Sequence, residues 1–263
     1  MKITSTSNQR VKDTVRLRNR RARKETGRFL VEGYREIGRA IEHGVVIREL
    51  WICPELFLGT NEPELIERAS STIVEARADV FRKIAYRDRP EGLLAVCEQF
   101  DTSLEHLSVG TNPLVLVVEG IEKPGNLGTM IRTAIAAKAD AVIVADQTTD
   151  VFNPNVVRAS IGTLFAMPLA VCSSAEAIAW LRERDVSICA ATPEGDADLW
   201  TAELQAVVVG AEQYGLSQTW LDEADIKVRI PMPGSDAIDS LNAATSASIL
   251  LFEAVRQRID ADR

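Results

Sequence analysis

A series of short, nearly continuous apolar runs in the second half of the chain constrains the fold more than any other feature. Val, Ile, Leu and Ala fill both faces of these runs, as strands buried on both sides of a sheet require. Helical stretches separate the runs, and this alternation predicts an open, mostly parallel sheet whose ligands sit beyond the strand carboxyl ends. The predicted strands are 113–120, 141–146, 167–172, 187–192, 205–212 and 227–232, and the predicted helices are 127–138, 154–164, 174–184 and 240–258.

The chain before this region has its own alternation of short strands and helices. It predicts a small α/β layer domain over residues 1–98. Residues 99–112 are polar and turn-forming with little periodicity, which is typical of a linker. The second domain then covers residues 113–263.

Charge is distributed unevenly between these regions. The whole chain has a net charge of −8, yet residues 1–39 hold twelve Lys or Arg against four Asp or Glu, a local net charge of +8. Local cations decide phosphate affinity, so a basic end on an acidic protein can bind nucleic acid. A solvated basic segment is the alternative. The candidate contacts are Arg10, Lys12, Arg16, Arg18, Arg20, Arg21 and Arg23.

Several classes of protein are poorly supported by the composition. No run approaches the roughly 18 apolar residues that cross a membrane, and the first residues lack the apolar core of a secretory signal. The four cysteines are scattered without a C-x-x-C pair, which favours reduced thiols in a cytoplasm. With only two histidines, a metal site and a Ser-His-Asp triad are both poorly supplied. We therefore expect a cytoplasmic protein without a metal.

The first of three unusual loops follows the strand at 113–120. Its residues 125–128, Gly-Asn-Leu-Gly, precede the predicted helix, whose free N–H groups could meet an anion. A simple turn is the alternative, because the sequence matches neither of the common phosphate-binding glycine motifs. Arg132 lies among apolar residues of that helix and needs a partner. That partner is either a structural carboxylate or a substrate phosphate.

Two further loops follow later strands. In "VVVGAEQYGLS" a strand ends at Gly210, where glycine allows a ligand to approach the backbone, and Glu212 is either a site residue or a solvated acid. In "IPMPGSDAIDSLNAATSASILLFEAVRQR" a Pro/Gly turn leads to a helix that Asp239 or Ser240 can cap. That helix is apolar or small on nearly every side, which indicates burial by the sheet and by a subunit interface. Asn242 at its start is a buried polar group or a structural cap.

Together the three loops resemble, in order and spacing, the three motifs of the SpoU (TrmH-like) RNA 2′-O-ribose methyltransferases of the SPOUT class. The stretch "SNQRVKDTVRLRNRRARKETGRFLVEG" is similar to the ribosomal-protein-L30e-like substrate-binding domain of that family. The resemblance implies a C-terminal mostly parallel open sheet with a deep trefoil knot, preceded by a small L30e-like α/β domain. The apolar pattern alone, by contrast, predicts an open sheet without a knot. The resemblance also implies a homodimer.

The resemblance further implies an enzyme that transfers a methyl group from S-adenosyl-L-methionine to a ribose 2′-hydroxyl. Its RNA is ribosomal rather than transfer RNA, because the L30e-like extension resembles the ribosomal branch, and 23S is favoured over 16S. By position, the catalytic residues are Arg132, Asn126, Glu212 and Asn242. The cofactor-binding residues are Gly210, Ile230, Met232, Ser240, Leu241 and Asn242.

The roles of these residues follow from their chemistry. A guanidinium stays protonated, so we expect Arg132 to hold a phosphate and stabilise the developing alkoxide rather than act as a base. In the family this arginine acts on a cofactor bound mainly by the other subunit. Asn126 orients the ribose, while Glu212 and Asn242 position the methyl donor and the hydroxyl.

Two features depart from the family pattern. Ala243-Ala244-Thr245 stands where the family commonly has Val-Ser-Val, and the turn before Ser240 is slightly long. Two other functional classes stay open at this point. One is a non-catalytic L30e-like RNA-binding protein, which leaves the three loops without a role. The other is a nucleotide-dependent enzyme with an ordinary open sheet, which the missing G-x-G-x-x-G motif disfavours.

Overall fold

The computed structural model describes residues 1–234 and 240–261, which form two compact units. One unit combines Met1–Phe100 with Asp150–Ala166, and the other combines Asp101–Thr149 with Met167–Arg263. The chain therefore passes between the units three times, whereas the predicted division has one linker at 99–112. The predicted α/β class is confirmed in both units.

The first unit is built on a five-stranded mixed sheet in the order β1-β4-β3-β5-β2. β1, β4 and β3 are parallel neighbours, while β5 runs antiparallel to both β3 and β2. The strands are β1 (Lys2–Ile3), β2 (Arg28–Glu32), β3 (Ile47–Ile52), β4 (Thr72–Ala76) and β5 (Leu93–Glu98).

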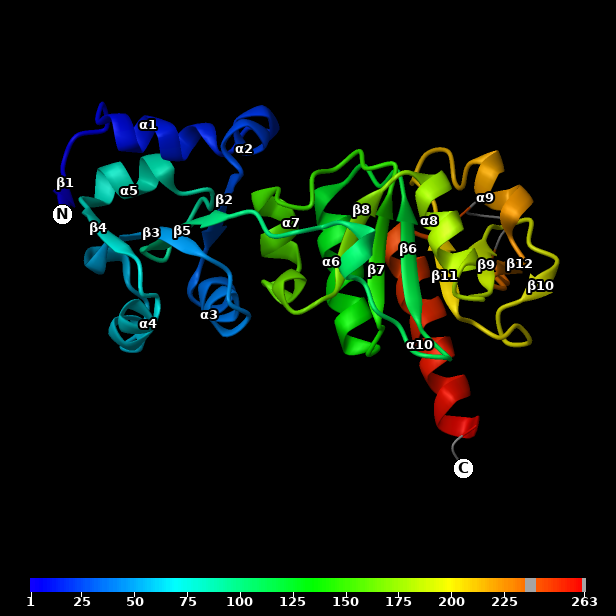
Figure 1. The fold of residues 1–263 in the computed structure, drawn as a ribbon. Coiled ribbons are helices and arrows are strands. Elements are labelled where there is room, and N and C mark those ends of the chain that lie inside the picture. Colours follow the sequence, from blue (N-terminus) through cyan, green and yellow to red (C-terminus); the bar gives the residue numbers. More distant parts are fainter. Residues whose placement is uncertain (235–239, 262–263) are drawn as a thin grey trace. The chain divides into compact units, whose positions relative to one another are not determined.

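Helices cover both faces of this sheet (Figure 1). α1 and α5 lie over one face, where Val11 of α1 and Phe81 of α5 are fully buried against Trp51. α3 and α4 lie over the other face. The helices are α1 (Gln9–Arg16), α2 (Arg20–Thr26), α3 (Tyr34–Glu42), η1 (Pro54–Leu56), α4 (Glu62–Arg68) and α5 (Ala78–Ile84).

Residues 150–166 belong to this first unit although they lie between two strands of the second sheet. The segment forms α7 (Pro154–Ala159) and η3 (Thr163–Phe165), where the sequence predicts one helix over 154–164. Phe152 lies 5.0 Å, ring centre to ring centre, from both Phe29 and Phe100. Since these rings are apolar and packed together, the hydrophobic effect holds the segment on β2 rather than on the second sheet.

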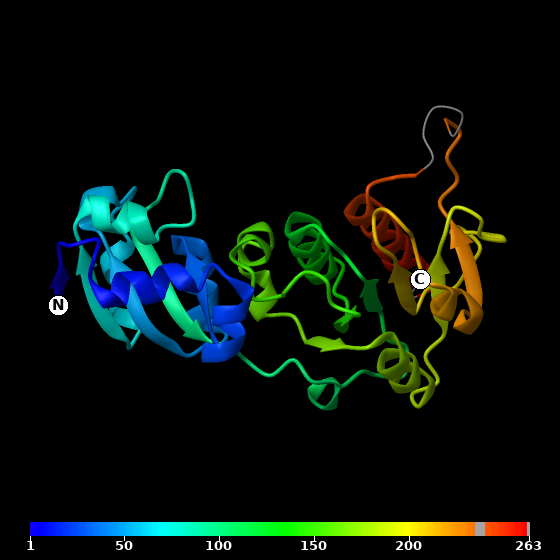
Figure 2. The same cartoon turned by 90° about the horizontal axis from the view of Figure 1, so that it is seen from above.

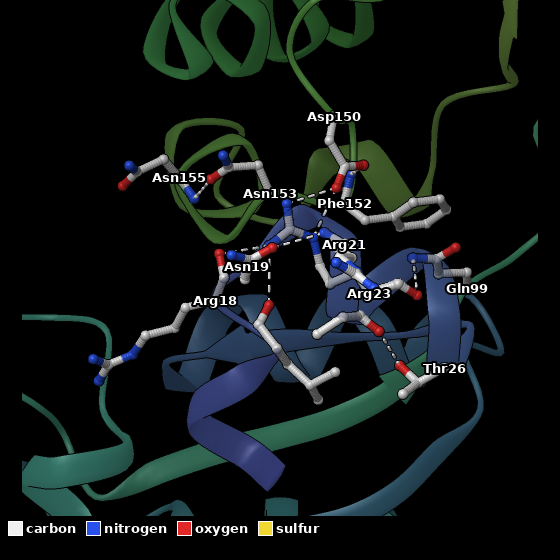
Figure 3. A network of polar contacts seen from close by, with 12 residues as sticks. Arg18, Asn19, Arg21, Arg23, Thr26, Gln99, Asp150, Phe152, Asn153 and Asn155 are labelled. Carbon is white, nitrogen blue, oxygen red and sulfur yellow. Dashed lines mark hydrogen bonds and ion pairs between the residues drawn. The ribbon is translucent and has the colours of Figure 1, made fainter. Parts of the chain in front are cut away.

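A buried ion pair also ties this segment to the basic helices. The Arg23 side chain is 2% exposed, and its Nη2 lies 2.6 Å from Oδ2 of Asp150 (Figure 3). Its Nη1 donates to the backbone carbonyls of Leu17 and Arg18, at 2.9 and 2.8 Å. These carbonyls follow the last turn of α1, so one guanidinium caps that helix and anchors the segment at Asp150.

The second unit contains a seven-stranded, all-parallel sheet in the order β10-β12-β9-β11-β6-β7-β8. This confirms the predicted mostly parallel sheet. Each of the six predicted strands is present. The strands are β6 (Val115–Glu119), β7 (Ala141–Ala145), β8 (Leu169–Cys172), β9 (Ile188–Ala191), β10 (Ala197–Asp198), β11 (Ala206–Val209) and β12 (Ile226–Arg229).

This sheet lies between two layers of helices (Figure 2). Trp180 of α8 and Trp220 of α9 pack on the face that carries Val117 of β6 and Val208 of β11. α6 and α10 pack together on the other face. The helices are η2 (Leu104–His106), α6 (Pro124–Ala136), α8 (Ser174–Arg182), α9 (Gln218–Glu223) and α10 (Ala243–Ala261). The sequence analysis did not predict helix α9 or the two-residue strand β10, because both are short.

Two predicted helix starts are wrong. α6 begins at Pro124, so the Gly-Asn-Leu-Gly residues form its first turns rather than a loop before it. Proline suits this first position because its missing N–H would have no helical partner there. α10 begins at Ala243 instead of 240, and Asn242 caps it. Ser240 makes no such cap, and Asp239 lies outside the described residues. The trefoil knot stays a prediction.

Candidate functional site

A cavity of about 420 Å³ opens at the carboxyl ends of β9, β11 and β12. This is the edge at which parallel sheets bind their ligands, and the volume is typical of small-molecule sites. Five of the six residues predicted to bind the cofactor line it, while Asn242 stands beside the lining residues Leu241 and Ala243. Those five are Gly210, Ile230, Met232, Ser240 and Leu241.

The turn at 210–215 shapes one wall of this cavity. Ala211 and Gly215 exchange two backbone hydrogen bonds of 3.1 and 3.0 Å, which closes a tight turn around Glu212. Gly215 has φ +66°, and a Cβ on Gly210 would stand 2.2 Å from the Gly215 carbonyl carbon. Both glycines are therefore needed for the turn, because a side chain at either position clashes or strains the backbone.

Three of the four predicted catalytic residues are joined by hydrogen bonds. The Asn126 side-chain amide donates to Oε1 of Glu212, and Asn242 Nδ2 donates to Asn126 Oδ1 at 3.3 Å. Glu212 also accepts from the backbone N–H of Glu122 at 3.3 Å. Each residue comes from a different one of the three loops, so the fold brings together side chains up to 116 positions apart.

Asn242 combines two functions that the sequence left as alternatives. Its Oδ1 accepts from the backbone N–H of Ala244 at 3.0 Å and of Thr245 at 3.3 Å, which caps α10. Its Nδ2 remains available for Asn126. Asn242 is exposed rather than buried, because it stands at the rim of the cavity.

Arg132 lies apart from the other three. It is exposed on α6, does not line the cavity, and makes no ion pair with any residue in 1–234 or 240–261. The alternative of a structural ion pair is therefore not borne out. Gly125, Thr129, Arg132 and Ala136 are all exposed at helical spacing, so Arg132 stands on an outward face of small residues.

The cavity has a further wall that sequence reasoning missed. Thr192, Pro193 and Glu194, which follow β9, line it. Thr192 Oγ1 donates to the Glu194 carboxylate at 2.6 Å, and this hydrogen bond holds the pKa of Glu194 below its ordinary value. The signal was available, because this stretch also follows a predicted parallel strand.

The basic residues predicted to contact RNA divide into two groups. Arg23 is buried, and Arg18 donates to the backbone carbonyls of Lys83 and Ala85 at the end of α5, so both serve the fold. The others present their side chains at the surface of the first unit, where Arg21 pairs with Glu25 at 2.7 Å. This surface group is Arg10, Lys12, Arg16, Arg20 and Arg21.

The described residues offer neither a metal site nor a membrane-spanning helix. Within 1–234 and 240–261, no group of three or more His, Cys, Asp and Glu is placed to hold a metal ion. Over the same residues, no helix is long and apolar enough to cross a membrane.

Residues 113–252, which contain the cavity and all three loops, match the SpoU rRNA Methylase family. The chain belongs to this family. The family prediction from the sequence is thereby confirmed. Residues 8–95 match a second family, the MRM3-like substrate binding domain.

Some relatives of this SpoU family member match over most of their length. The 23S rRNA (uridine(2479)-2′-O)-methyltransferase of Streptomyces viridochromogenes is 34% identical over 253 residues, covering 92% of this chain and 88% of that protein. The 23S rRNA (guanosine(2553)-2′-O)-methyltransferase RlmP of Bacillus subtilis is 30% identical, covering 95% and 97%. The solved SpoU methyltransferase AviRb from Streptomyces viridochromogenes in complex with AdoMet has 32% identity and a TM-score of 0.89, covering 96% and 98%.

Proposed function

We propose that this protein is an S-adenosylmethionine-dependent methyltransferase that methylates a ribose 2′-hydroxyl in ribosomal RNA. The single observation that carries the proposal is the hydrogen-bonded set of Asn126, Glu212 and Asn242 beside a cofactor-sized cavity. The reaction and the methyl donor are those predicted from the sequence, and the family match and its relatives bear both out. Relatives named for 23S rRNA favour that RNA over 16S.

The cavity fits S-adenosylmethionine by size and by lining. Apolar Ile230, Met232 and Leu241 suit an adenine ring, and the 210–215 turn contributes its backbone to the cavity wall. When bound, the cofactor supplies an electrophilic methyl group on a sulfonium. Gly210, Ile230, Met232, Ser240 and Leu241 would hold it.

The chain's own residues then align the ribose. Asn126 is oriented by Glu212 on one side and by Asn242 on the other, which leaves one N–H and one lone pair of its amide to meet a sugar hydroxyl. Arg132 is permanently charged and exposed, which suits the phosphate next to the target ribose and the negative charge that develops on its oxygen. Holding the reactants in line supplies much of the acceleration.

The position of Arg132 supports a homodimer. It stands on the outward face of α6, and the adjoining helix α10 exposes Thr245, Phe252 and Ile259 at helical spacing. Phe252 is 50% exposed and Ile259 is 51% exposed, so this face of α10 presents large apolar side chains. A second copy of this chain on these two helices covers the apolar face and brings Arg132 to the partner's cavity.

Oligomeric state tests this part of the proposal. We expect light scattering to give a dimer mass for the wild-type chain and a monomer mass for Phe252→Asp, because a buried charge disrupts the interface. Leu58→Asp, at a residue 79% exposed in the first unit, is the matched control and stays dimeric. A monomeric wild-type protein would contradict the dimer.

The first unit delivers the RNA. Its basic surface group, the half-buried Arg10 with the exposed Lys12, Arg16, Arg20 and Arg21, provides the cations for phosphate contacts. Arg23 is left out because its donors are occupied inside the unit, and Arg18 is left out because its Nη2 is held by the carbonyls of Lys83 and Ala85. We expect each Ala replacement in this surface group to weaken RNA binding and to lower the salt slope by about one. Since ribosomal RNA is the substrate, we place the enzyme in the cytoplasm.

Methyl transfer tests the function directly. Purified protein is incubated with methyl-labelled S-adenosylmethionine and either 23S, 16S or transfer RNA, and the modified nucleotide is mapped by its resistance to alkaline cleavage. We expect label in ribosomal RNA at one 2′-hydroxyl and none with Arg132→Ala. Label in transfer RNA alone supports the same chemistry on another substrate. RNA binding without any S-adenosylmethionine binding supports the non-catalytic RNA-binding alternative and contradicts the proposal.

A further inference from the structure

A buried carboxylate, Glu119, is bonded to the chain just after the cavity-lining turn and belongs to none of the residues assigned above. Glu119 is the last residue of β6 and is 7% exposed. Its Oε2 accepts the backbone N–H of Ser217 at 2.8 Å. Ser217 directly follows Leu216, which lines the cavity, so Glu119 holds the chain where the cofactor-lining turn ends.

A second attachment supports the same short segment. Trp220 is fully buried, and its Nε1 donates to Ser174 Oγ at 2.8 Å. Ser174 lies at the start of α8, and its hydroxyl is 2.5 Å from Asp146 Oδ2 and 3.4 Å from Glu119 Oε1. The four side chains form one polar network, and its bonds to the Ser217 N–H and the Trp220 indole hold the segment 217–220.

Glu119 and Glu212 link the same two loops, and each carboxylate accepts hydrogen bonds from the loop to which the other belongs. Glu119, before the first loop, accepts an N–H from the end of the second. Glu212, inside the second loop, accepts the Glu122 N–H and the Asn126 amide of the first. The supporting strands β6 and β11 are parallel neighbours, with Val118 opposite Val209. The loops are therefore held together at two points, one through Glu212 and one through Glu119.

We propose that Glu119 is a positioning residue for methyl transfer, which fixes the cofactor-lining turn through the Ser217 amide and so sets the affinity for S-adenosylmethionine. This inference rests on the proposed function. A buried carboxylate is costly unless its oxygens are hydrogen-bonded. Here Oε2 is bonded to the backbone N–H of Ser217, the neighbour of the cavity-lining residue Leu216. Glu119 itself does not line the cavity, so its effect reaches the cofactor only through the turn.

Two replacements separate the hydrogen bond from the volume of the side chain. Glu119→Gln keeps an acceptor oxygen for Ser217, whereas Glu119→Met keeps a similar length and removes the acceptor. We expect calorimetry to give a Kd for S-adenosylmethionine raised about tenfold or more in Glu119→Met and within about threefold of wild type in Glu119→Gln. The KM for RNA at saturating cofactor should stay within about twofold in both, because the turn does not carry the basic surface.

Asp140 provides the matched control. Its Oδ2 accepts the backbone N–H of Leu114 at 2.7 Å, the same kind of bond at the opposite end of β6. Asp140→Ala should lower the thermal stability without changing the Kd for the cofactor. An equal rise in Kd in Asp140→Ala and Glu119→Met, or an unchanged Kd in Glu119→Met, overturns the inference.

Hydrogen exchange tests the inference in the wild-type chain. This measurement does not depend on whether a Glu119 variant folds. The Ser217 amide should exchange more slowly than the amides of Gln213 and Tyr214 at the exposed tip of the turn. Equal exchange rates contradict the role of Glu119. Failure of the wild-type chain to bind S-adenosylmethionine at all contradicts the proposed function instead.

Discussion

Asn126 donates its side-chain amide to the carboxylate of Glu212, although the two residues lie 86 positions apart. Asn126 belongs to the first turn of α6, and Glu212 to the glycine-bounded turn after β11. Both turns stand at the carboxyl ends of adjacent parallel strands, β6 and β11, which explains why they meet. This hydrogen bond links the wall of the cofactor cavity to the residue that we expect to face the ribose.

Removal of the Glu212 carboxylate should therefore impair the reaction more than the binding of RNA. In Glu212→Ala the Asn126 amide loses its orienting partner, and we expect kcat to fall roughly 100-fold, since small misplacements at a reacting centre have effects of this size. Asn126→Ala should give a similar loss, and the double variant should cost less than the sum of the two. Single-turnover methyl transfer measures this, with Asn61→Ala on the first unit as the control. A fully additive double variant contradicts a shared role.

Arg132 should act across the dimer. Arg132→Ala and Gly210→Ala are each expected to be inactive, the second because its Cβ would meet the Gly215 backbone at 2.2 Å. In a one-to-one mixture, heterodimers combine an intact cavity with an intact Arg132 of the other subunit. About half of the dimers are then heterodimers, and each heterodimer has one working site out of two. Methyl transfer should therefore recover to about a quarter of the wild-type rate. If the mixture stays inactive, Arg132 acts at the cavity of its own subunit.

The Arg23–Asp150 pair should be important for stability. Since both partners are nearly buried, Asp150→Ala leaves an unpaired guanidinium inside the first unit, with an expected cost of about 3–5 kcal/mol. Arg21→Ala removes an exposed pair with Glu25 and should cost less than about 1 kcal/mol. Urea unfolding of the two variants measures the difference. Similar costs would mean that the buried pair is no stronger than a surface one.

The stability of the first unit should depend on the ionisation of Glu32. Burial raises the pKa of Glu32, and the N–H groups of Tyr86 and Arg87 offset this only in part. The folded chain therefore binds a proton at a higher pH than the unfolded chain does. As the pH falls through the raised pKa toward the ordinary value of 4.5, wild type should gain stability relative to Glu32→Gln.

Below 4.5 the difference between the two chains should stay constant, because both states of wild type are then protonated. Urea unfolding between pH 7 and 4 measures it, with Glu64→Gln on α4 as an exposed control. A difference that grows with rising pH has the wrong sign and contradicts the assignment.

Much of the second sheet could be predicted because its strands are buried on both faces. Runs such as Val115–Glu119 contain almost only apolar residues, and this pattern has few other solutions in a folded chain. The start of α6 was misjudged, since glycines usually indicate a turn and here they allow a helix to begin at Pro124. Residues 150–166 lie inside the predicted second domain yet group with the first unit, because an apolar segment does not say which apolar surface it will cover.

The sequence by itself determined the alternation of strands and helices, the three loops and the residues in them, because these depend on local pattern and residue type. Only the tertiary structure decided that Asn126, Glu212 and Asn242 are hydrogen-bonded to one another, while Arg132 faces outward and Arg23 is buried. Glu119 is a similar case, since nothing in its neighbours predicts a bond to Ser217, 98 positions away. Contacts between distant segments arise from strand order and packing, and neither is encoded in the spacing of a single loop.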